Sequence, residues 1–370
     1  MAPGRRALVG WSYRRPMLEL RSVSRSAGRE AVFHQANLIF SPDTPTVLLG
    51  LSPEGRKVAL RVIAGAERPD AGKILVDGRE RRRGRDGGAR YTWINRAGSA
   101  PSGRSVGKTL RATAAGKLDE DDLARLAGRV GLAGRLDART RDLDLNQRLR
   151  LAIGCALAGQ RSAILLEAPF QDLSLPVRAG LLRELAGMLA GAQAVIILAA
   201  ATPDEALALG GQTVILVRGR VVQAGPTAEV FAHPCDLRAA LATAYPVLNT
   251  LGVTLADGVC RLADGSTFHA PSGLKLPATG FCTLAFRPDD LGFERQNDHA
   301  VRFAVRTDGE EMVAGRRFLR AKFADAIWFA PHPGVAAAPG MVLSVFVDVD
   351  HVMAFDQAGL AVGAKPGRHG

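Results

Sequence analysis

Cysteine, histidine and aromatic residues are all scarce in this chain of 370 residues, of which 5% are aromatic. The cysteines are too widely separated to form the close pairs of a zinc site or a redox motif, and they are Cys155, Cys235, Cys260 and Cys282. We therefore expect reduced thiols that fill the core, and no metal site. Histidine is absent between His34 and His233, so no imidazole is available in the central part of the chain.

The sequence also lacks a long apolar run. The stretch of nearly membrane-spanning length, residues 185–201, is interrupted by Gly187, Gly191 and Gln193, and it predicts a helix followed by a buried strand. The N-terminus has no apolar segment or cleavage site of a secretion signal, so we expect a plain leader there. If the protein works at a membrane, we expect it to do so from outside the bilayer.

Positive charge is in excess, with a formal net charge of +12. This balance suits an acidic partner such as a nucleotide, an anionic lipid or a nucleic acid. Many of the arginines lie in one glycine-rich run, residues 79–90, with no aromatic residue among them before Tyr91. That pattern favours a solvated loop over a nucleic-acid footprint, and we expect no nucleic-acid partner.

Hydrophobic residues make up 47% of the chain, enough for a large core and two domains. Alternation of apolar and polar residues predicts a strand at residues 18–23, and short apolar runs predict buried strands at residues 46–49, 164–166 and 195–198. Helical patterns follow them at residues 57–64, 147–158 and 177–189. Buried strands alternating with helices predict an α/β domain with a mostly parallel sheet, over residues 17–240.

After about Pro234 the pattern changes to short alternating stretches between turn residues, as in residues 259–262, 282–286 and 342–347. This pattern predicts a small β-barrel or sandwich over residues 241–360. We expect the basic tail from Lys365 to fray.

A glycine-bounded loop follows the predicted strand at residues 46–49. Strand, loop and helix N-terminus form the arrangement that cradles phosphates, because backbone amides and the helix dipole point at the anion. The working phosphate loop ends in Lys and then Ser or Thr, but this loop has Arg56 and Lys57 there, so it has no hydroxyl for magnesium. The candidate nucleotide contacts are Gly50, Gly55, Arg56, Lys57 and Val58. Taken alone, the loop is equally consistent with an ordinary strand-to-helix turn.

Residues 61–78 read RVIAGAERPDAGKILVDG and resemble the segment that follows the phosphate loop in ABC-transporter ATPases. The resemblance covers residues 17–240 and implies a P-loop NTPase nucleotide-binding domain that takes ATP and Mg²⁺. It also implies a second ABC ATPase subunit and transmembrane permease subunits as partners.

Several chemical groups of that family are missing at the matching positions. Ala27 replaces the aromatic residue that stacks on adenine, and Asn95 replaces the glutamine that senses magnesium. Glu167 matches the magnesium-binding aspartate, but Ala168 and Ala201 replace the catalytic glutamate and the switch histidine. A methyl group can neither accept a proton nor orient a water molecule, so no catalytic residue is intact. Residues 96–103 lack the bulky side chains that dock the membrane subunit, which implies a weaker contact.

The family's signature "LSGGQ" corresponds to Leu143, Asp144, Leu145, Asn146 and Gln147. By resemblance, these residues would face the γ-phosphate bound by the opposite subunit. A carboxylate at Asp144 would repel that phosphate. The alternative is structural, with Asp144 as the N-cap of the following helix. Likewise, Arg56 has the alternative of pairing with Glu54 or Glu167.

The second domain resembles the regulatory β-domain, OB-like in fold, of sugar and glycerol-phosphate importer ATPases. Residues 285–290 (AFRPDD) are similar to the "GIRPED" motif and residues 354–359 (AFDQAG) to "LFDPETG". Residues 28–40 and 245–250 are most similar to the glycerol importer branch. These resemblances imply a sugar, glycerol or glycerol-phosphate as the solute.

The sequence thus predicts a cytoplasmic subunit, peripheral to the inner face of the membrane, that binds ATP weakly or not at all and supports an intact partner ATPase. Two alternatives remain open. One is a regulatory interaction protein that uses the ABC fold outside a transporter, and the other is a decaying paralogue. Co-purification with membrane subunits distinguishes the first hypothesis from the others.

Overall fold

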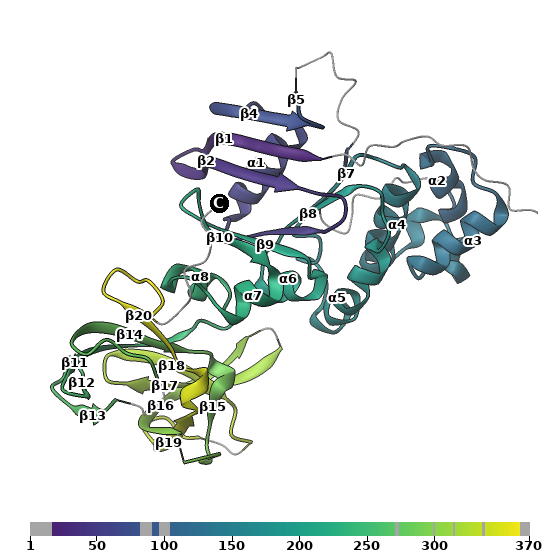
Figure 1. Cartoon of the computed structure of the whole chain (residues 1–370). Helices are drawn as coiled ribbons and strands as arrows, with labels where there is room; N and C mark the ends of the chain where they lie inside the picture. The colour runs from purple at the N-terminus through teal and green to yellow at the C-terminus, as the bar shows by residue number, and fades with distance from the viewer. Residues whose placement is uncertain are drawn as a thin grey trace, which may run out of the picture.

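The computed structural model describes residues 17–81, 91–95, 104–270, 274–298, 300–313, 315–334 and 337–362. Figure 1 shows an α/β part and, at the lower left, a part made almost entirely of strands. Residues 185–201 contain the end of helix α5 (Leu175–Leu189) and strand β8 (Val195–Ala199), which confirms the predicted helix and buried strand. Within the described residues, no helix has both the length and the hydropathy needed to cross a membrane.

A six-stranded, mostly parallel sheet forms the centre of the α/β part, in the order β10-β9-β3-β8-β7-β6. Strand β3 pairs in parallel with β8 and β9, and β7 pairs in parallel with β6 and β8, whereas the edge strand β10 is antiparallel. Besides β8, the strands are β3 (Thr46–Leu49), β6 (Tyr91–Asn95), β7 (Ala163–Glu167), β9 (Gln212–Val217) and β10 (Arg220–Pro226). This sheet confirms the predicted fold class.

Successive side chains of the central sheet enter two different cores, because neighbouring residues of a strand point to opposite faces. Leu48, Leu165 and Ile197 pack on one face with helix α1 (Pro53–Ala64) and a second, antiparallel sheet. That sheet has the order β2-β1-β4-β5, with β1 (Leu18–Ala27), β2 (Glu30–Phe40), β4 (Ala71–Val76) and β5 (Arg79–Glu80).

Helices cover the other face of the central sheet, where Val47 and Ile164 belong to the larger core (Figure 1). Besides α5, these helices are α4 (Leu145–Ala158), α6 (Pro203–Leu209), α7 (Thr227–Ala232) and α8 (Leu237–Ala242). Helices α2 (Val106–Thr113) and α3 (Glu120–Arg129) pack against α4 on its far side from the sheet. Short 3₁₀ turns occur at Ala133–Arg135, Thr140–Asp142, Pro288–Asp290 and Val349–His351.

The C-terminal part consists of two five-stranded antiparallel sheets. The first has the order β13-β12-β11-β14-β20, with β11 (Asn249–Ala256), β12 (Val259–Arg261), β13 (Thr267–His269), β14 (Gly280–Phe286) and β20 (Met353–Asp356). The second has the order β15-β19-β16-β17-β18, with β15 (Leu291–Gly292), β16 (Val301–Val313), β17 (Arg316–Phe323), β18 (Ala326–Pro331) and β19 (Val342–Val347). The expected β-rich C-terminal domain is confirmed.

One aromatic cluster fills the space between these two sheets. Trp328 is 1% exposed and meets Phe286 edge-to-face at 4.9 Å between ring centroids. It also stacks on Phe323 at 4.5 Å. Its indole Nε1 donates to the carbonyl of Thr250 at 3.0 Å, so the buried ring has its polar group satisfied.

Helix α8 joins the two parts of the chain. Its Ala240 is buried in a small core with Ala285 and Phe355 of the C-terminal sheets. The boundary expected between residues 240 and 241 falls inside this helix. The half-buried Arg287 guanidinium also crosses the junction, since Nη1 donates to the carbonyl of Thr243 and Nη2 to that of Phe231, both at 2.9 Å.

Candidate functional site

The site residues expected from the sequence lie at the carboxyl edge of the central sheet. In the parallel register, Asn95 pairs with Glu167, and Glu167 pairs with Ala199, two residues before Ala201. The glycine-bounded loop leaves the same edge at the end of β3. Because parallel strands all end at one edge, residues far apart in sequence are brought together, in the place where ligands of such sheets bind.

Gly50 begins the loop in a backbone conformation that excludes other residues. Its φ is +90°, and a Cβ atom there would lie 2.3 Å from the carbonyl oxygen of Leu216. The chain therefore passes so close to β9 that only glycine fits. This part of the expected loop is present.

Beyond Gly50 the loop closes into a helix earlier than expected. Helix α1 begins at Pro53, and not near Lys57, because Ser52 is an N-cap with proline at the first helical position. The Ser52 hydroxyl accepts from the Gly55 amide at 3.0 Å, and the Ser52 carbonyl accepts from the Arg56 amide at 2.9 Å. Two amides of the expected phosphate cradle are thus engaged within the chain, and Pro53 has none to offer.

Arg56 is buried beneath this turn, with 7% of its surface exposed. Its Nη1 donates to the carbonyl of Leu51 at 3.0 Å, and in the described part of the chain it forms no ion pair with Glu54 or Glu167, the alternative weighed from the sequence. Burial lowers the pKa of the guanidinium, while the nearby charges of Glu205 and Glu167 raise it. Arg56 Nε is a buried donor without a hydrogen-bond partner in the described part of the chain.

Neighbouring positions of the loop have no group for a metal ion. Lys57 is exposed, and Val58 is 6% exposed and packs in the core beneath the antiparallel sheet. Within the described residues, no three His, Cys, Asp or Glu side chains come together in a way that could hold a metal ion. At Lys57 the chain therefore has no hydroxyl of the kind that ligates magnesium in the family's loop.

Glu167 is held by a residue that the motifs do not identify. Trp93 on β6 donates from its indole Nε1 to Glu167 Oε2 at 3.1 Å. Burial raises the pKa of the Glu167 carboxyl, and this hydrogen bond lowers it. Alternation along β6 places Trp93 on the same face as Asn95, which is the one sequence signal for this contact.

The two alanines stand where the family's catalytic groups are expected. Ala168 is 3% exposed, has a φ of +38° and donates its amide to the carbonyl of Ala199 at 3.1 Å. The Ala201 amide donates to Glu205 Oε2 at 2.9 Å. A carboxyl group thus lies beside the position of the switch histidine, but it is fully buried and Arg178 contacts its other oxygen at 3.3 Å.

The signature positions form the start of helix α4. Asp144 accepts from the Gln147 amide at 2.8 Å, and the Gln147 side chain accepts from the Asp144 amide at 3.3 Å. This reciprocal pair is a capping box, so the N-cap role weighed as an alternative is present. Asn146 Oδ1 accepts from Arg150 Nε at 2.9 Å. Leu143 is buried, whereas Leu145 is 41% exposed.

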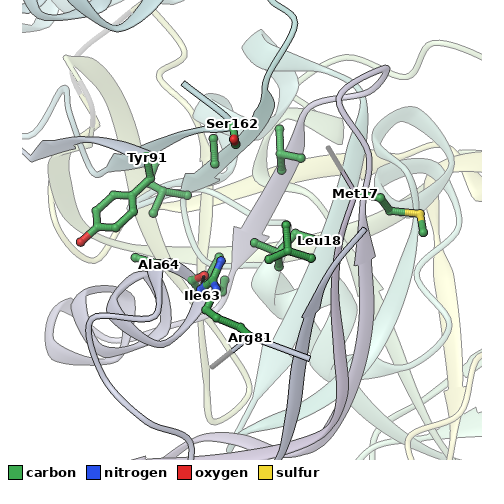
Figure 2. Close-up of a pocket in the computed structure, with 11 residues that line it drawn as sticks. Met17, Leu18, Ile63, Ala64, Arg81, Tyr91 and Ser162 are labelled. Atoms are coloured by element: carbon green, nitrogen blue, oxygen red, sulfur yellow. Dashed lines mark hydrogen bonds between the residues drawn. The ribbon is translucent and has the colours of Figure 1, made fainter. Parts of the chain in front are cut away.

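An apolar cavity lies at the opposite edge of the central sheet (Figure 2). Tyr91, Ala163 and Val195, which line it, are the first residues of β6, β7 and β8. The cavity is therefore separate from the carboxyl edge where Asn95 and Glu167 lie. Residues 82–90, with most of the arginine run, and residues 96–103, expected to face the membrane subunit, lie outside the described residues.

Comparison with known proteins agrees with this arrangement, although no protein-family model matches the chain. The "Fe(3+) ions import ATP-binding protein FbpC" of Pseudomonas fluorescens is 30% identical over 289 residues, covering 74% of this chain and 78% of that protein. The "Sulfate/thiosulfate import ATP-binding protein CysA" of Caulobacter vibrioides is 30% identical over 300 residues, covering 75% of this chain and 84% of that protein.

Among solved structures, cbiO1 from Clostridium perfringens, part of the ABC transporter complex cbiONQ, has a similar fold. It matches with a TM-score of 0.51 at 21% identity, over 58% of this chain and 90% of that chain. The fold is thus that of an ABC ATPase with a C-terminal β-domain. Fold and sequence together show that the chain belongs to the family of ABC-transporter ATP-binding subunits of the import type.

Proposed function

We propose that this chain is an ATP-binding subunit of an ABC importer that has lost its own ATP hydrolysis and works beside an intact partner ATPase. The main support is Ala168, since no side chain at the end of β7 beyond Glu167 can accept a proton from water. The loss of the switch histidine at Ala201 acts in the same direction.

Binding of ATP with Mg²⁺ is what the family implies, and we propose that this chain binds ATP weakly or not at all. Lys57 has no hydroxyl to ligate magnesium, and Glu167 is engaged by Trp93. At the signature, Asp144 would place a carboxylate beside the partner's triphosphate and oppose closure of the dimer. A pair of two copies of this chain would therefore contain no competent site.

We further propose that the chain works at the inner face of the membrane, through permease subunits and a second ATPase. The relatives are named for import of Fe(3+) and of sulfate or thiosulfate. Those names do not support the sugar, glycerol or glycerol-phosphate solute expected from the C-terminal motifs. We propose a small solute only.

The test of this proposal is steady-state phosphate release by the purified chain with magnesium and ATP. We expect no release above background, because the proton acceptor is absent. Turnover that disappears in the Gly55→Asp variant would contradict the proposal, since that substitution places a carboxylate in the expected cradle. Recovery of the tagged chain with membrane subunits would separate an importer role from a regulatory role outside a transporter.

A further inference from the structure

The carboxylate of Glu30 lies against the loop in which a nucleotide phosphate would be expected. Glu30 is the first residue of β2 and follows the tight turn at Gly28, whose φ is +58°. The Ser52 hydroxyl donates to Glu30 Oε2. The same hydroxyl accepts from the Gly55 amide at 3.0 Å, so a chain of hydrogen bonds runs from the helix amide through Ser52 to the carboxylate.

The second oxygen of Glu30 also lies over the first turn of α1. A Cβ atom at Gly55 would be 3.1 Å from Glu30 Oε1 and 3.1 Å from Ser52 Oγ. The absence of a side chain at Gly55 therefore leaves just enough room for the carboxylate. Both oxygens of Glu30 are thus next to the N-terminus of a 12-residue helix.

This is the place where a helix attracts an anion. Amides at a helix N-terminus carry partial positive charge, and a carboxylate or a phosphate placed there is stabilised by it. Arg56, on the same first turn of α1, is buried, donates to the Leu51 carbonyl of the loop and has an unpartnered Nε, so a cationic side chain belongs to this turn. A bound phosphate and the carboxylate of Glu30 would compete for this positive potential and repel each other.

We propose that Glu30 is a built-in anion that takes the place of the nucleotide phosphate at the N-terminus of α1. The chain then holds its phosphate loop closed without nucleotide, and triphosphate binds only if the carboxylate is removed or displaced. The inference rests on the proposed function, because it identifies residues 50–58 with the family's phosphate loop. It adds a cause for weak ATP binding that is independent of the missing catalytic groups.

The experiment is calorimetric titration of the full-length chain with inorganic triphosphate and with ATP, each without magnesium. The wild-type chain should bind either ligand with a dissociation constant of about 1 mM or weaker. Glu30→Gln keeps the size of the side chain and removes its charge, and it should bind inorganic triphosphate at least ~10-fold more tightly than the wild type. Ser52→Ala removes the hydroxyl that holds the carboxylate and should also gain binding.

The matched control is Glu54→Gln, which removes a charge from the exposed side of the same helical turn. It should gain much less than Glu30→Gln. The inference is overturned if Glu54→Gln and Glu30→Gln gain equally in affinity. It is also overturned if the wild type binds as tightly as both Glu30→Gln and Ser52→Ala. The two proposals can be told apart. Tight wild-type binding without turnover contradicts the role of Glu30 and the weak binding of ATP, but it leaves the loss of hydrolysis standing. Turnover contradicts the loss of hydrolysis.

Discussion

Glu205 is a carboxyl group with no exposed surface, located where helix α6 meets the position of the switch histidine. Burial raises its pKa from the ordinary 4.5 to about 7, and the hydrogen bond from the Ala201 amide and the charge of Arg178 offset part of that rise. Its other charged neighbours are Asp204, which raises the pKa, and Arg56, which lowers it. Loss of contact with water therefore affects the pKa of Glu205 more than its charged and hydrogen-bonded neighbours do.

Glu205 should make the folded chain less stable as the pH rises from about 4.5 to about 7. In that window the folded state binds more protons than the unfolded state, so stability is greatest below the lower value and is lost through the higher one. The full effect is roughly 3 kcal/mol, from about 1.4 kcal/mol per pKa unit. Glu205→Gln should flatten this dependence in urea unfolding measured across the pH range. An unchanged slope in the variant would refute it.

At the start of helix α4, the residues that match the family's signature cap the helix. Asp144 and Gln147 satisfy each other's backbone amides, and Arg150 engages the side chain of Asn146. The side chains of Asp144, Asn146 and Gln147 are thus each bonded to a group of this same helix or its cap. A helix start that is well capped gains stability from residues that, in the family, would face a nucleotide.

Asp144→Ala should lower the free energy of unfolding by about 1 kcal/mol, because the Gln147 amide loses its acceptor. Asp144→Asn is the matched control, since asparagine caps a helix nearly as well as aspartate. Chemical denaturation of both variants measures the difference. If the two variants lose the same stability, the cap is not what Asp144 contributes.

At the scale of the whole molecule, the C-terminal sheets are joined to the α/β part by backbone and side-chain contacts. The Leu237 amide donates to the carbonyl of Gly359, and the Ala361 amide to that of Cys235. The Arg287 guanidinium donates to two carbonyls of the α/β part. Burial lowers its pKa, although the nearby Asp290 and Asp289 act in the opposite direction. We therefore expect the two parts to unfold together.

Arg287→Ala should uncouple that unfolding. Two carbonyls lose a charged donor, and hydrogen bonds to charged groups contribute about 1.5–3 kcal/mol each. Calorimetry should then show two thermal transitions in place of one. Arg316→Ala is the control, since its pair with Asp289 is exposed on both sides and contributes less than about 1 kcal/mol. A single transition in Arg287→Ala would show that the apolar contacts of α8 suffice.

Much of the candidate site could be predicted because it depends on chain order and on which side chains exist. Parallel strands place Gly50, Asn95 and Glu167 at one edge whatever the details of packing. The sequence also contains a local signal for the start of α1, because Ser52 followed by Pro53 is typical of an N-cap and a first helical residue. The phosphate-loop motif predicted a later start, and the local cap prevailed.

What each side chain bonds to could not be predicted. Ser52 and Glu30 are 22 positions apart, and Trp93 and Glu167 are 74 apart. Such contacts arise only when sheets and helices pack, because a hydrogen bond forms over about 3 Å and no periodicity in the sequence specifies that distance.

The amino-acid sequence is enough to establish the family, the α/β fold and the absence of a proton acceptor at Ala168, because no folding can supply an atom that the chain lacks. Only the tertiary structure decides that Glu30, Arg56 and Glu205 come to the edge of the sheet. There, each of them is held by a partner within the chain: Glu30 by the Ser52 hydroxyl, Arg56 by the Leu51 carbonyl, and Glu205 by the Ala201 amide. Such contacts depend on packing, because a hydrogen bond requires the two atoms to meet within about 3 Å.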